Sequence, residues 1–223
     1  MQKNHSEIFK IDGVGVNLAR FHPCTAEEKK ALRAGLGYAD DDFIITVVAE
    51  LNRNKNQIML ARSVPGLRRT IPALKVLLIG KETLPDVREF VERERLGDTV
   101  QFLGYRHDVD LLTMAGDIAF SASLREGLPV NIIEAMACGI PVVCSDNRGH
   151  RSLVRDKETG LIFSPKSEKE MTDAFILLYK NPALREEMGR RNVSEARKYS
   201  VDIAVERMAW IYRRYIGVHW EEE

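Results

Sequence analysis

The sequence predicts an α/β fold, a doubly wound parallel sheet with a helical tail at the C-terminus. From residue 43 onward, short apolar runs alternate with amphipathic stretches, which is the pattern of strands alternating with helices. Each run is apolar on both of its faces, as are the strands of a parallel sheet that is covered on both sides. After Pro165 the chain reads as three helices with no strand between them. Right-handed crossovers would wind the repeated units into one sheet.

The expected strands are short and are bounded by Gly, Pro or polar residues. They are FIITVVAEL (43–51), KVLLIG (75–80), VQFLG (100–104), DIAFSAS (117–123) and PVVCS (141–145). β-branched residues dominate several of these runs, as is common in strands. We expect them to belong to a parallel sheet of six strands between two layers of helices.

The expected helices show apolar residues at helical spacing. Those within the sheet region span 57–69, 86–96, 108–115 and 130–138, and those of the tail region span 168–180, 183–199 and 202–216. Pro72 ends the first of them. The helix over 130–138 is apolar nearly all round, so it should be buried.

Composition excludes several classes of protein. The chain of 223 residues has 33 Lys plus Arg and 33 Asp plus Glu, so no excess charge indicates nucleic acid or an anionic membrane as a partner. No apolar run approaches the ~20 residues of a transmembrane helix, and the polar N-terminus lacks the apolar region of a signal peptide. We therefore expect a cytoplasmic protein whose membrane association is at most peripheral.

Three cysteines, Cys24, Cys138 and Cys144, have no metal-ligand spacing. An odd number of cysteines is consistent with free thiols in a reducing compartment. Cys138 and Cys144 lie in apolar runs, which predicts that they fill the core rather than act as nucleophiles.

The segment SASLREGLPVNIIEAMACGIPVVCSD (121–146) is the most informative part of the sequence. A strand is expected to end at Ser123, a loop follows, and Pro129 suits the first turn of the next helix. Such a unit directs free backbone N–H groups toward the carboxyl edge of the sheet, where they can bind an anion. Gly127 would let the backbone approach a phosphate closely.

Two glutamates in this segment restrict the kinds of ligand that the site could bind. Glu126 lies at the mouth of the expected site, and Glu134 lies on an otherwise apolar helix. A buried carboxylate must be paired or hydrogen-bonded. Paired hydroxyls of a sugar would satisfy both acids, whereas a bare phosphate would be repelled. The pattern favours a nucleotide attached to a polyol, and the alternative is that Glu134 pairs inside the protein.

Glu126 and Glu134, followed by EAMACGIPVV, resemble the paired-glutamate motif of retaining GT-B glycosyltransferases of the family 4 type. Three further segments are similar to that family in the same order. They are LNRNKNQ (51–57), VQFLGYRHDV (100–109) and DNRGHRSLVRDKETGLIF (146–163). The resemblance covers most of the chain and implies the Rossmann-like C-terminal domain of the GT-B fold, which binds the nucleotide-sugar donor.

The resemblance also implies a role for individual residues. Lys55 would neutralise the diphosphate, and Glu126 would contact the donor sugar near the reacting carbon, so these two are the expected catalytic residues. Glu134 would accept hydrogen bonds from the ribose. The remaining donor-binding residues would act largely through their backbone: Gly127, Leu128 and Val130 would bind phosphate or sugar oxygens, and Tyr105 and Arg106 would frame the base.

One position departs from the family pattern. Ala49 and Glu50 stand where the family often has Gly-Arg, so one phosphate-binding cation is missing. Arg53, two residues before Lys55, could replace it. The alternative is that Arg53 is simply an exposed side chain in a polar loop.

The resemblance implies an acceptor-binding N-terminal domain of comparable size. IDGVGVNLARFHP (11–23) looks like the segment between the two domains, so the expected division is 1–23 interdomain segment, 24–200 donor-binding domain and 201–223 helix. That last helix is rich in large apolar residues: Met208, Trp210, Ile211, Tyr212, Tyr215 and Ile216. It is expected to pack on the absent domain or, alternatively, on its own domain.

No metal ligand is expected. Asp108-Val109-Asp110 matches the D-x-D motif of metal-dependent glycosyltransferases with another fold, but Asp108 suits the N-cap of a helix. His107 and His150 are interpreted as polar loop residues, of which His150 could touch a ligand. A lysine and a helix N-terminus can stabilise a diphosphate leaving group without metal.

The expected function is donor binding in a retaining glycosyltransferase, with a nucleotide-diphosphate sugar such as a UDP-sugar as substrate and no cofactor. The acceptor would be a glycan or a lipid-linked glycan, in polysaccharide biosynthesis. The family's mechanism implies that the donor phosphate helps to deprotonate the acceptor. Two alternatives remain open: a non-catalytic nucleotide-sugar-binding subunit that needs a separate acceptor-domain chain, and a sugar-nucleotide epimerase.

Overall fold

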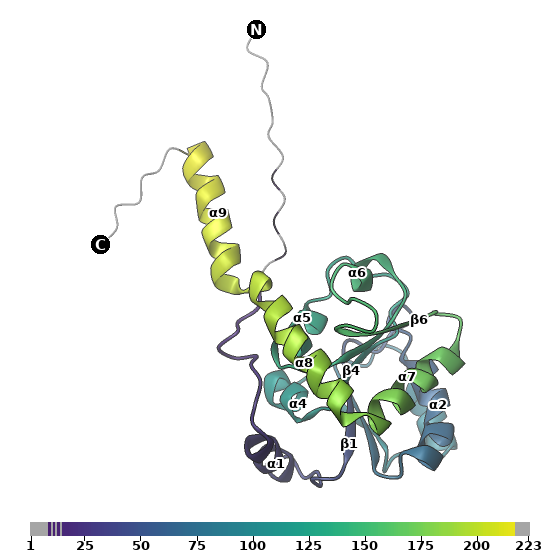
Figure 1. Ribbon diagram of the computed structural model, residues 1–223. Helices are drawn as coiled ribbons and strands as arrows, with labels where there is room; N and C mark the ends of the chain where they lie inside the picture. Colours follow the sequence, from purple (N-terminus) through teal and green to yellow (C-terminus); the bar gives the residue numbers. More distant parts are fainter. Residues whose placement is uncertain (1–8, 10, 12, 14, 217–223) are drawn as a thin grey trace.

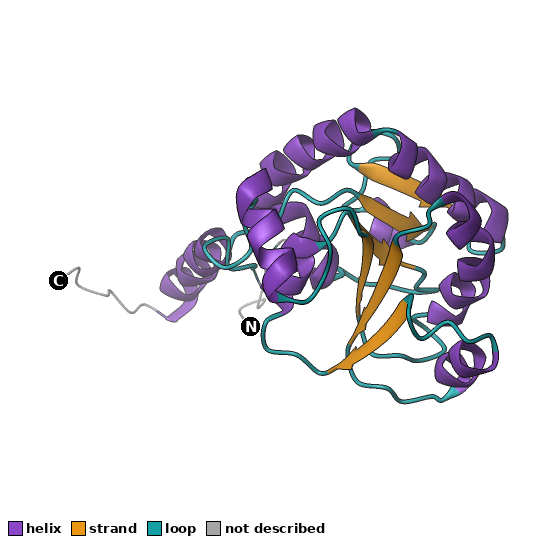
Figure 2. Ribbon diagram, turned by 90° about the horizontal axis from the view of Figure 1, so that it is seen from below, coloured by secondary structure: helices purple, strands orange, loops and turns teal. Residues whose placement is uncertain are grey.

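The computed structural model describes residues 9, 11, 13 and 15–216, and six strands in this part of the chain form one parallel sheet (Figures 1 and 2). The strand order is β3-β2-β1-β4-β5-β6, and every neighbouring pair is parallel. The strands are β1 (Phe43–Val48), β2 (Leu74–Ile79), β3 (Val100–Gly104), β4 (Ile118–Ser121), β5 (Val142–Ser145) and β6 (Gly160–Phe163). The predicted doubly wound sheet is confirmed.

Helices cover both faces of this sheet (Figure 2). One layer contains α2 (Gln57–Thr70), α3 (Asp86–Arg93) and α7 (Glu168–Lys180). The other contains α1 (Ala26–Gly35), α4 (Val109–Ala115), α5 (Val130–Ala137) and α8 (Pro182–Ala196). Three short or terminal elements complete the described chain: α6 (Arg148–Arg151), the 3₁₀ turn Arg197–Tyr199 and α9 (Val201–Ile216).

Helix α6, β6 and α1 are three elements that the sequence-based expectation does not include, and α6 is described with the site. β6 is not among the five strands named from the sequence, because GLIF is a run of only four residues that begins with glycine. Helix α1 was missed because its sequence is mostly polar, although Thr25 and Glu28 form a capping box before it. That Thr-x-x-Glu spacing is the signal that would have located the helix.

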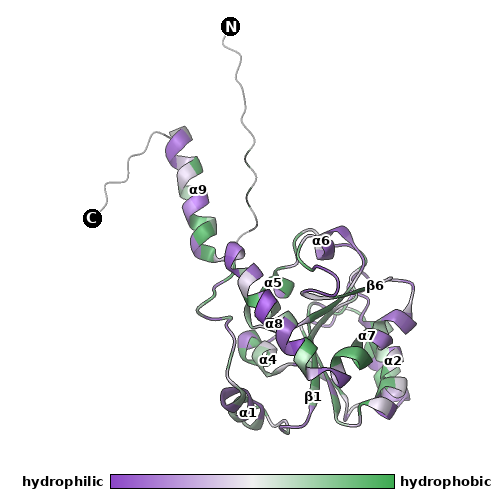
Figure 3. Cartoon of the chain, in the orientation of Figure 1, coloured by the Kyte–Doolittle hydropathy of each residue, from purple (hydrophilic) through white to green (hydrophobic). Residues whose placement is uncertain are grey.

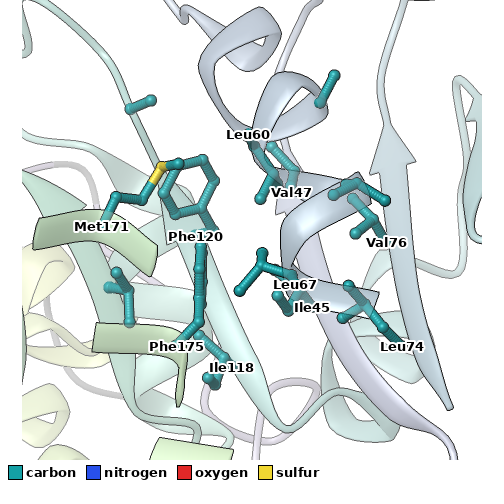
Figure 4. Packing of buried hydrophobic residues seen from close by; sticks show 14 of the residues in the cluster. Ile45, Val47, Leu60, Leu67, Leu74, Val76, Ile118, Phe120, Met171 and Phe175 are labelled. Atoms are coloured by element: carbon teal, nitrogen blue, oxygen red, sulfur yellow. The ribbon is translucent and has the colours of Figure 1, made fainter. Parts of the chain in front are cut away.

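The main core lies between the sheet and the layer of α2, α3 and α7 (Figure 4). Phe120 from β4 is 2% exposed, and its ring stacks on Phe163 with ring centroids 5.9 Å apart. The Phe175 ring from α7 lies 5.3 Å from it. Leu67 and Ile45 extend the same layer from α2 and β1. This packing fixes the central strands, whose carboxyl ends carry the loops of the candidate site.

Replacing Phe120 with alanine should therefore lower the free energy of unfolding by ~3–5 kcal/mol, because the substitution leaves a cavity that neighbouring rings cannot fill. Urea unfolding measures the change. Leu177→Ala is the matched control, since Leu177 on α7 is 45% exposed and its loss should change stability by no more than about 0.5 kcal/mol. Equal losses in the two variants would contradict the assigned core.

The order of the strands reverses between β1 and β4. The chain runs outward from β1 through β2 to β3, and then returns to the centre and runs the other way from β4 to β6. In sheets of this kind ligands bind outside the carboxyl ends of the strands at such a reversal. The segments after β1 and β4 are therefore the first place to look for a site.

Helix α9 stands away from the sheet and its helices (Figures 1 and 3). None of its residues from 201 to 214 is buried, and Trp210 is 52% exposed. Val16 and Ser200 form a parallel bridge at its base, and the Phe9 ring packs edge-to-face on Trp210 at 5.6 Å. Within the described residues, α9 thus has no buried face against the body of its own domain, and both alternatives for its packing stay predictions.

Packing of α9 on a second domain stays a prediction. The division of the chain at residues 23 and 200 also stays a prediction. Parts of the two predicted end segments lie outside the described residues, namely 1–8, 10, 12, 14 and 217–223. Among the described residues, no helix combines the length and the apolar character required to span a membrane.

Cys138 and Cys144 are buried in the core, as predicted. Burial raises the pKa of the Cys138 thiol to about 12 and also raises the pKa of Cys144. A thiol with a raised pKa is a poor nucleophile, because the thiolate is the reactive form.

Candidate functional site

The structure brings Lys55 and Glu126 together at the point where the strand order reverses. Lys55 lies in the loop after β1, and Glu126 lies in the loop after β4, the neighbouring strand. The Lys55 Nζ atom is 2.5 Å from Glu126 Oε1, and the two side chains are 24% and 12% exposed. The sequence placed these residues 71 positions apart, and the sheet topology makes them an ion pair.

Asn54 connects the loop after β1 to the loop after β4. Its side-chain amide donates to the carbonyl of Arg125 at 3.1 Å, and its side-chain oxygen accepts from the Arg125 amide at 3.2 Å. The backbone carbonyl of Asn54 accepts from the Leu124 amide at 2.8 Å. Three hydrogen bonds from one residue therefore fix Lys55 relative to Glu126.

The environment keeps Glu126 ionised. Burial raises the pKa of its carboxyl, but hydrogen bonds from Lys55 and Ser123, together with the charge of Lys55, outweigh burial. The net pKa lies below the ordinary value for glutamic acid. The site thus holds the Glu126 carboxylate and the Lys55 ammonium group in contact. A ligand with its own charged or hydrogen-bonding groups could replace either of them as the partner of the other.

The loop from Gly127 leads into the N-terminus of α5. The backbone N–H groups of Gly127, Leu128 and Val130 have no hydrogen-bond partner among the described residues. No side chain caps the helix, so its first amides and the positive end of its dipole face outward. Pro129 is at the N-cap position with extended backbone, one residue earlier than the sequence suggested. The free amides expected from the sequence thus lie at this end of the helix, and anion binding by them stays a prediction.

Glu134 lies one turn into α5 and is partly buried. Burial raises the pKa of its carboxyl; the charge of Arg20 lowers it and that of Asp110 raises it, and the net pKa is above the ordinary value. Its carboxylate makes no hydrogen bond or ion pair within the described part of the chain. The alternative that Glu134 pairs inside the protein therefore finds no support there.

Arg20 is a site residue that the sequence did not reveal. It donates to Asp110 at 2.8 Å and to the carbonyl of His107, so it ties the segment before α1 to the loop after β3. Its charge also acts on Glu134. No local pattern marks Arg20 as a site residue, because the partners of its side-chain hydrogen bonds are at least 87 positions away.

Tyr105 and Arg106 follow β3, as expected from the sequence. Tyr105 is 76% exposed, and its ring meets the His107 ring edge-to-face at 5.2 Å. Arg106 pairs with Asp108 at 2.5 Å. Asp108 occupies the N-cap position of α4, as expected, although its side chain pairs with Arg106 and makes no capping hydrogen bond.

The two aspartates of the D-x-D sequence have different partners, Arg106 for Asp108 and Arg20 for Asp110. In the described residues, no cluster of three or more His, Cys, Asp or Glu side chains has a geometry that could hold a metal ion.

Arg53 is exposed and has no hydrogen-bond or ion-pair partner in the described chain. Glu50 is exposed as well, and Gln57 holds only its backbone carbonyl, at 2.8 Å. Ala49 fits tightly, since a Cβ on Gly80 would lie 2.0 Å from its carbonyl oxygen. The structure thus leaves Arg53 free to contact a ligand, and its role as phosphate ligand stays a prediction.

His150 is not the polar loop residue that the sequence suggested. It lies on α6 and is 0% exposed, beneath Glu126. Gly149 beside it packs so closely that a Cβ there would lie 2.6 Å from the Glu126 Cβ. The segment after β5 therefore forms the third wall of the site, beside the loops after β1 and β4.

A doubly wound sheet with an ion pair, an uncapped helix N-terminus and a partly buried carboxylate at its reversal point defines an α/β domain with a polar site at the carboxyl edge of its sheet. Comparison with known proteins is specific about the family. Residues 28–194 match the family described as "Glycosyl transferases group 1". The chain belongs to this glycosyltransferase family and has the size and fold of the C-terminal domain of a GT-B enzyme.

Two curated relatives cover nearly all of the chain. It is 34% identical to "Putative glycosyltransferase EpsD" of Bacillus subtilis over 100% of its length and 59% of the relative's. It is 29% identical to an N,N'-diacetylbacillosaminyl-diphospho-undecaprenol alpha-1,3-N-acetylgalactosaminyltransferase of Campylobacter jejuni, over 95% of its own length and 55% of the relative's. The chain thus spans little more than half the length of these relatives.

Solved structures show the same fold. HepE of Anabaena, crystallised with UDP and glucose, superposes with a TM-score of 0.81 at 21% identity, over 90% of this chain and 55% of HepE. The isolated C-terminal domain of a group 1 glycosyltransferase, LpcC of Francisella tularensis, superposes with a TM-score of 0.73 at 20% identity, over 84% of this chain and 100% of that domain.

Proposed function

We propose that this chain binds the nucleotide-diphosphate sugar of a retaining glycosyltransferase. The observation that carries the proposal is the Lys55–Glu126 ion pair at the reversal of strand order, beside the uncapped N-terminus of α5. A cation and free amides are the groups that a diphosphate needs, and carboxylates are the groups that sugar hydroxyls need.

The chemistry assigned to each group follows from its charge and place. Departure of the diphosphate concentrates negative charge on its oxygens, which Lys55 and the α5 amides would stabilise. Glu126, kept ionised, would accept a hydrogen bond from the donor sugar once Lys55 turns to the diphosphate. Glu134, whose carboxylate has no hydrogen bond from the described residues, would accept from the ribose hydroxyls. The bare-phosphate alternative is disfavoured, since two carboxylates would face it.

The acceptor is proposed to be a glycan or a lipid-linked glycan of a polysaccharide or glycolipid pathway. The support comes from relatives: the Campylobacter enzyme is named for a diphospho-undecaprenol acceptor and an alpha linkage. Since the chain covers 55% of that relative, acceptor binding is proposed to need a further domain, in the same or another polypeptide. The exposed apolar residues of α9 are consistent with such a neighbour.

Thermal unfolding with a panel of ligands tests donor binding. A nucleoside diphosphate at about 100 times its Kd should stabilise the domain by ~2.7 kcal/mol and raise its Tm. UDP, GDP and ADP are the probes, and inorganic phosphate and glucose are controls that should not shift the Tm. A shift with phosphate equal to that with the nucleotides would contradict a site built for a nucleotide-linked polyol.

Nucleotide affinity should depend on the ionisation of Glu134. The ionised carboxylate accepts on both oxygens and more strongly than the protonated acid, whose O–H is a donor, and burial raises the pKa of Glu134 above the ordinary value. As the pH falls, affinity should therefore begin to drop at a higher pH than the ~4.3 of an ordinary glutamate would give. Calorimetry as a function of pH measures the profile. Glu134→Gln should remove the part of the pH dependence that comes from Glu134 and leave the part that comes from ionisation of the nucleotide's phosphate. A pH profile that is unchanged in this variant would refute the assignment.

A further inference from the structure

The third wall of the site contains a buried polar network without an assigned role. It is centred on His150, which with Ser121, Ser123 and Ser145 has 7% or less of its surface exposed. Four buried polar side chains in one place are unusual in a domain core, because each loses its water and needs a protein partner. These four side chains lie between the ends of β4 and β5 and extend toward Glu126.

The ring of His150 bridges two strands. Its Nδ1 atom is 2.6 Å from the carbonyl oxygen of Ser145 at the end of β5. We assign the ring proton to Nδ1, because a carbonyl only accepts and this contact is shorter than the 2.8 Å contact of Nδ1 with the Asn147 amide nitrogen. The other nitrogen, Nε2, lies 3.0 Å from Ser121 Oγ at the end of β4 and accepts from that hydroxyl. Burial lowers the pKa of His150, which favours this neutral form.

From Ser121 the network reaches Glu126. The hydroxyl oxygens of Ser121 and Ser123 are 3.2 Å apart, so the two side chains are in contact, and a hydrogen bond from the Ser123 hydroxyl lowers the pKa of the Glu126 carboxyl. Because each serine has one hydroxyl proton, and these go to His150 and to Glu126, the two serines are joined by packing and not by a hydrogen bond. Ser123 is also held through its backbone, because its carbonyl accepts from Ser145 Oγ at 2.6 Å and from the Asn147 amide at 2.8 Å. The residue that delivers a hydrogen bond to Glu126 is therefore fixed from both sides.

Asn147 joins the histidine to the same point. Its side-chain oxygen accepts from the His150 backbone amide at 3.0 Å, which caps α6, while its amide donates to Ser123. The amide nitrogen also lies 2.8 Å from His150 Nδ1, so the two side chains are in contact. Gly149 then brings the α6 backbone against Glu126 itself, with no space for a Cβ.

We propose that His150 is a positioning residue for Glu126. Resting on the proposed function, the inference is that the neutral imidazole fixes Ser121 and Ser123, so that Glu126 stays oriented toward the donor sugar when Lys55 turns to the diphosphate. His150 touches no substrate in this account. It acts on the sugar-contacting carboxylate, because the nucleotide-binding groups lie on other elements, Lys55 in the loop after β1 and Glu134 on helix α5.

Two substitutions separate the contacts of the ring. In His150→Asn the side-chain amide occupies the place of Nδ1 and keeps a donor for Ser145, but nothing reaches Ser121. In His150→Gln the amide extends to the place of Nε2 and can contact Ser121. The glutamine variant should therefore restore most of what the asparagine variant loses.

The first arm of the experiment uses amide hydrogen exchange on the ligand-free 223-residue chain. The Leu124 amide, which bonds Asn54 at 2.8 Å, reports on the loop that carries Glu126. The Val76 amide, which bonds Thr99 at 2.7 Å, reports on the core. His150→Asn should raise exchange at Leu124 at least tenfold and leave Val76 unchanged. No change at Leu124, or an equal rise at both amides, overturns the proposal in favour of no role or a general structural role.

The second arm compares UDP with UDP-glucose, and GDP with GDP-mannose, by calorimetry. His150→Asn should leave the Kd of the nucleoside diphosphate unchanged and shift the ratio of the two Kd values by roughly tenfold, about the effect of one hydrogen bond to a charged group. Equal weakening of both ligands, or an unchanged ratio, overturns the proposal. If the unsubstituted chain binds no nucleotide, the proposed function fails, while the exchange arm still decides whether His150 holds the loop.

Discussion

Lys55→Ala should weaken nucleoside diphosphate binding by ~10–100-fold, because a charge-assisted hydrogen bond to a phosphate oxygen is lost. In an intact transferase the same change should lower the transfer rate by ~10²–10³, since the leaving diphosphate would lose its preorganised cation. The pKa of Glu126 should rise as well, because Lys55 is one of its two hydrogen-bond donors. Calorimetry measures the affinity, and carboxyl NMR titration measures the pKa.

Two variants in the same loop serve as controls for Lys55. Lys55→Arg keeps the charge and should keep most of the affinity. Arg53→Ala removes an exposed arginine two residues away and decides whether Arg53 replaces the missing family cation: a similar loss would assign it to the phosphate, and no loss would leave it as a surface residue. Unchanged affinity in Lys55→Ala would contradict the site as assigned.

Glu134→Ala should abolish most nucleotide affinity, by ~10²-fold, because the ribose hydroxyls lose a charged acceptor in a partly buried position. Its effect on folding should have the opposite sign. The folded state raises the pKa of Glu134, so at neutral pH its ionised form is less stable in the folded chain than in the unfolded chain. Removing the carboxylate should therefore leave the free energy of unfolding unchanged or increased.

Urea unfolding measures the stability of the Glu134 variants and calorimetry measures their nucleotide affinity, so the two together test whether affinity falls while stability does not. Glu134→Gln is the control of equal size, and it should lose affinity in the same direction without leaving a cavity. Loss of both stability and binding in these variants would mean that Glu134 supports the fold, and its assignment to the ribose would then be wrong.

The parallel sheet and much of the site followed from local sequence patterns. Apolar runs covered on both faces located five of the six strands, and the run from Ser121 to Asp146 located the loop and helix that carry Glu126 and Glu134. Lys55 came from the family resemblance and not from its spacing. Its 2.5 Å contact with Glu126 was beyond the sequence, because the contact depends on β1 and β4 being neighbours.

What the sequence missed has a common physical cause. Arg20 and His150 act through partners that are distant in the chain or lie on adjacent strands, and a single polar residue carries no periodicity to reveal this. The polar loop expected around His150 is a short helix over a buried network, because parallel strands bring three serines to one edge. The departure at Ala49 and Glu50 was visible in the sequence, but the place where Glu50 lies was not.

The most direct test of a nucleotide-sugar donor site is calorimetric titration of the 223-residue chain with UDP, GDP and ADP. The account predicts that one of the three nucleotides binds and that binding is lost in Glu134→Ala. Binding that persists at full affinity in both Glu134→Ala and Lys55→Ala, or an absence of binding to all three nucleotides, would contradict it.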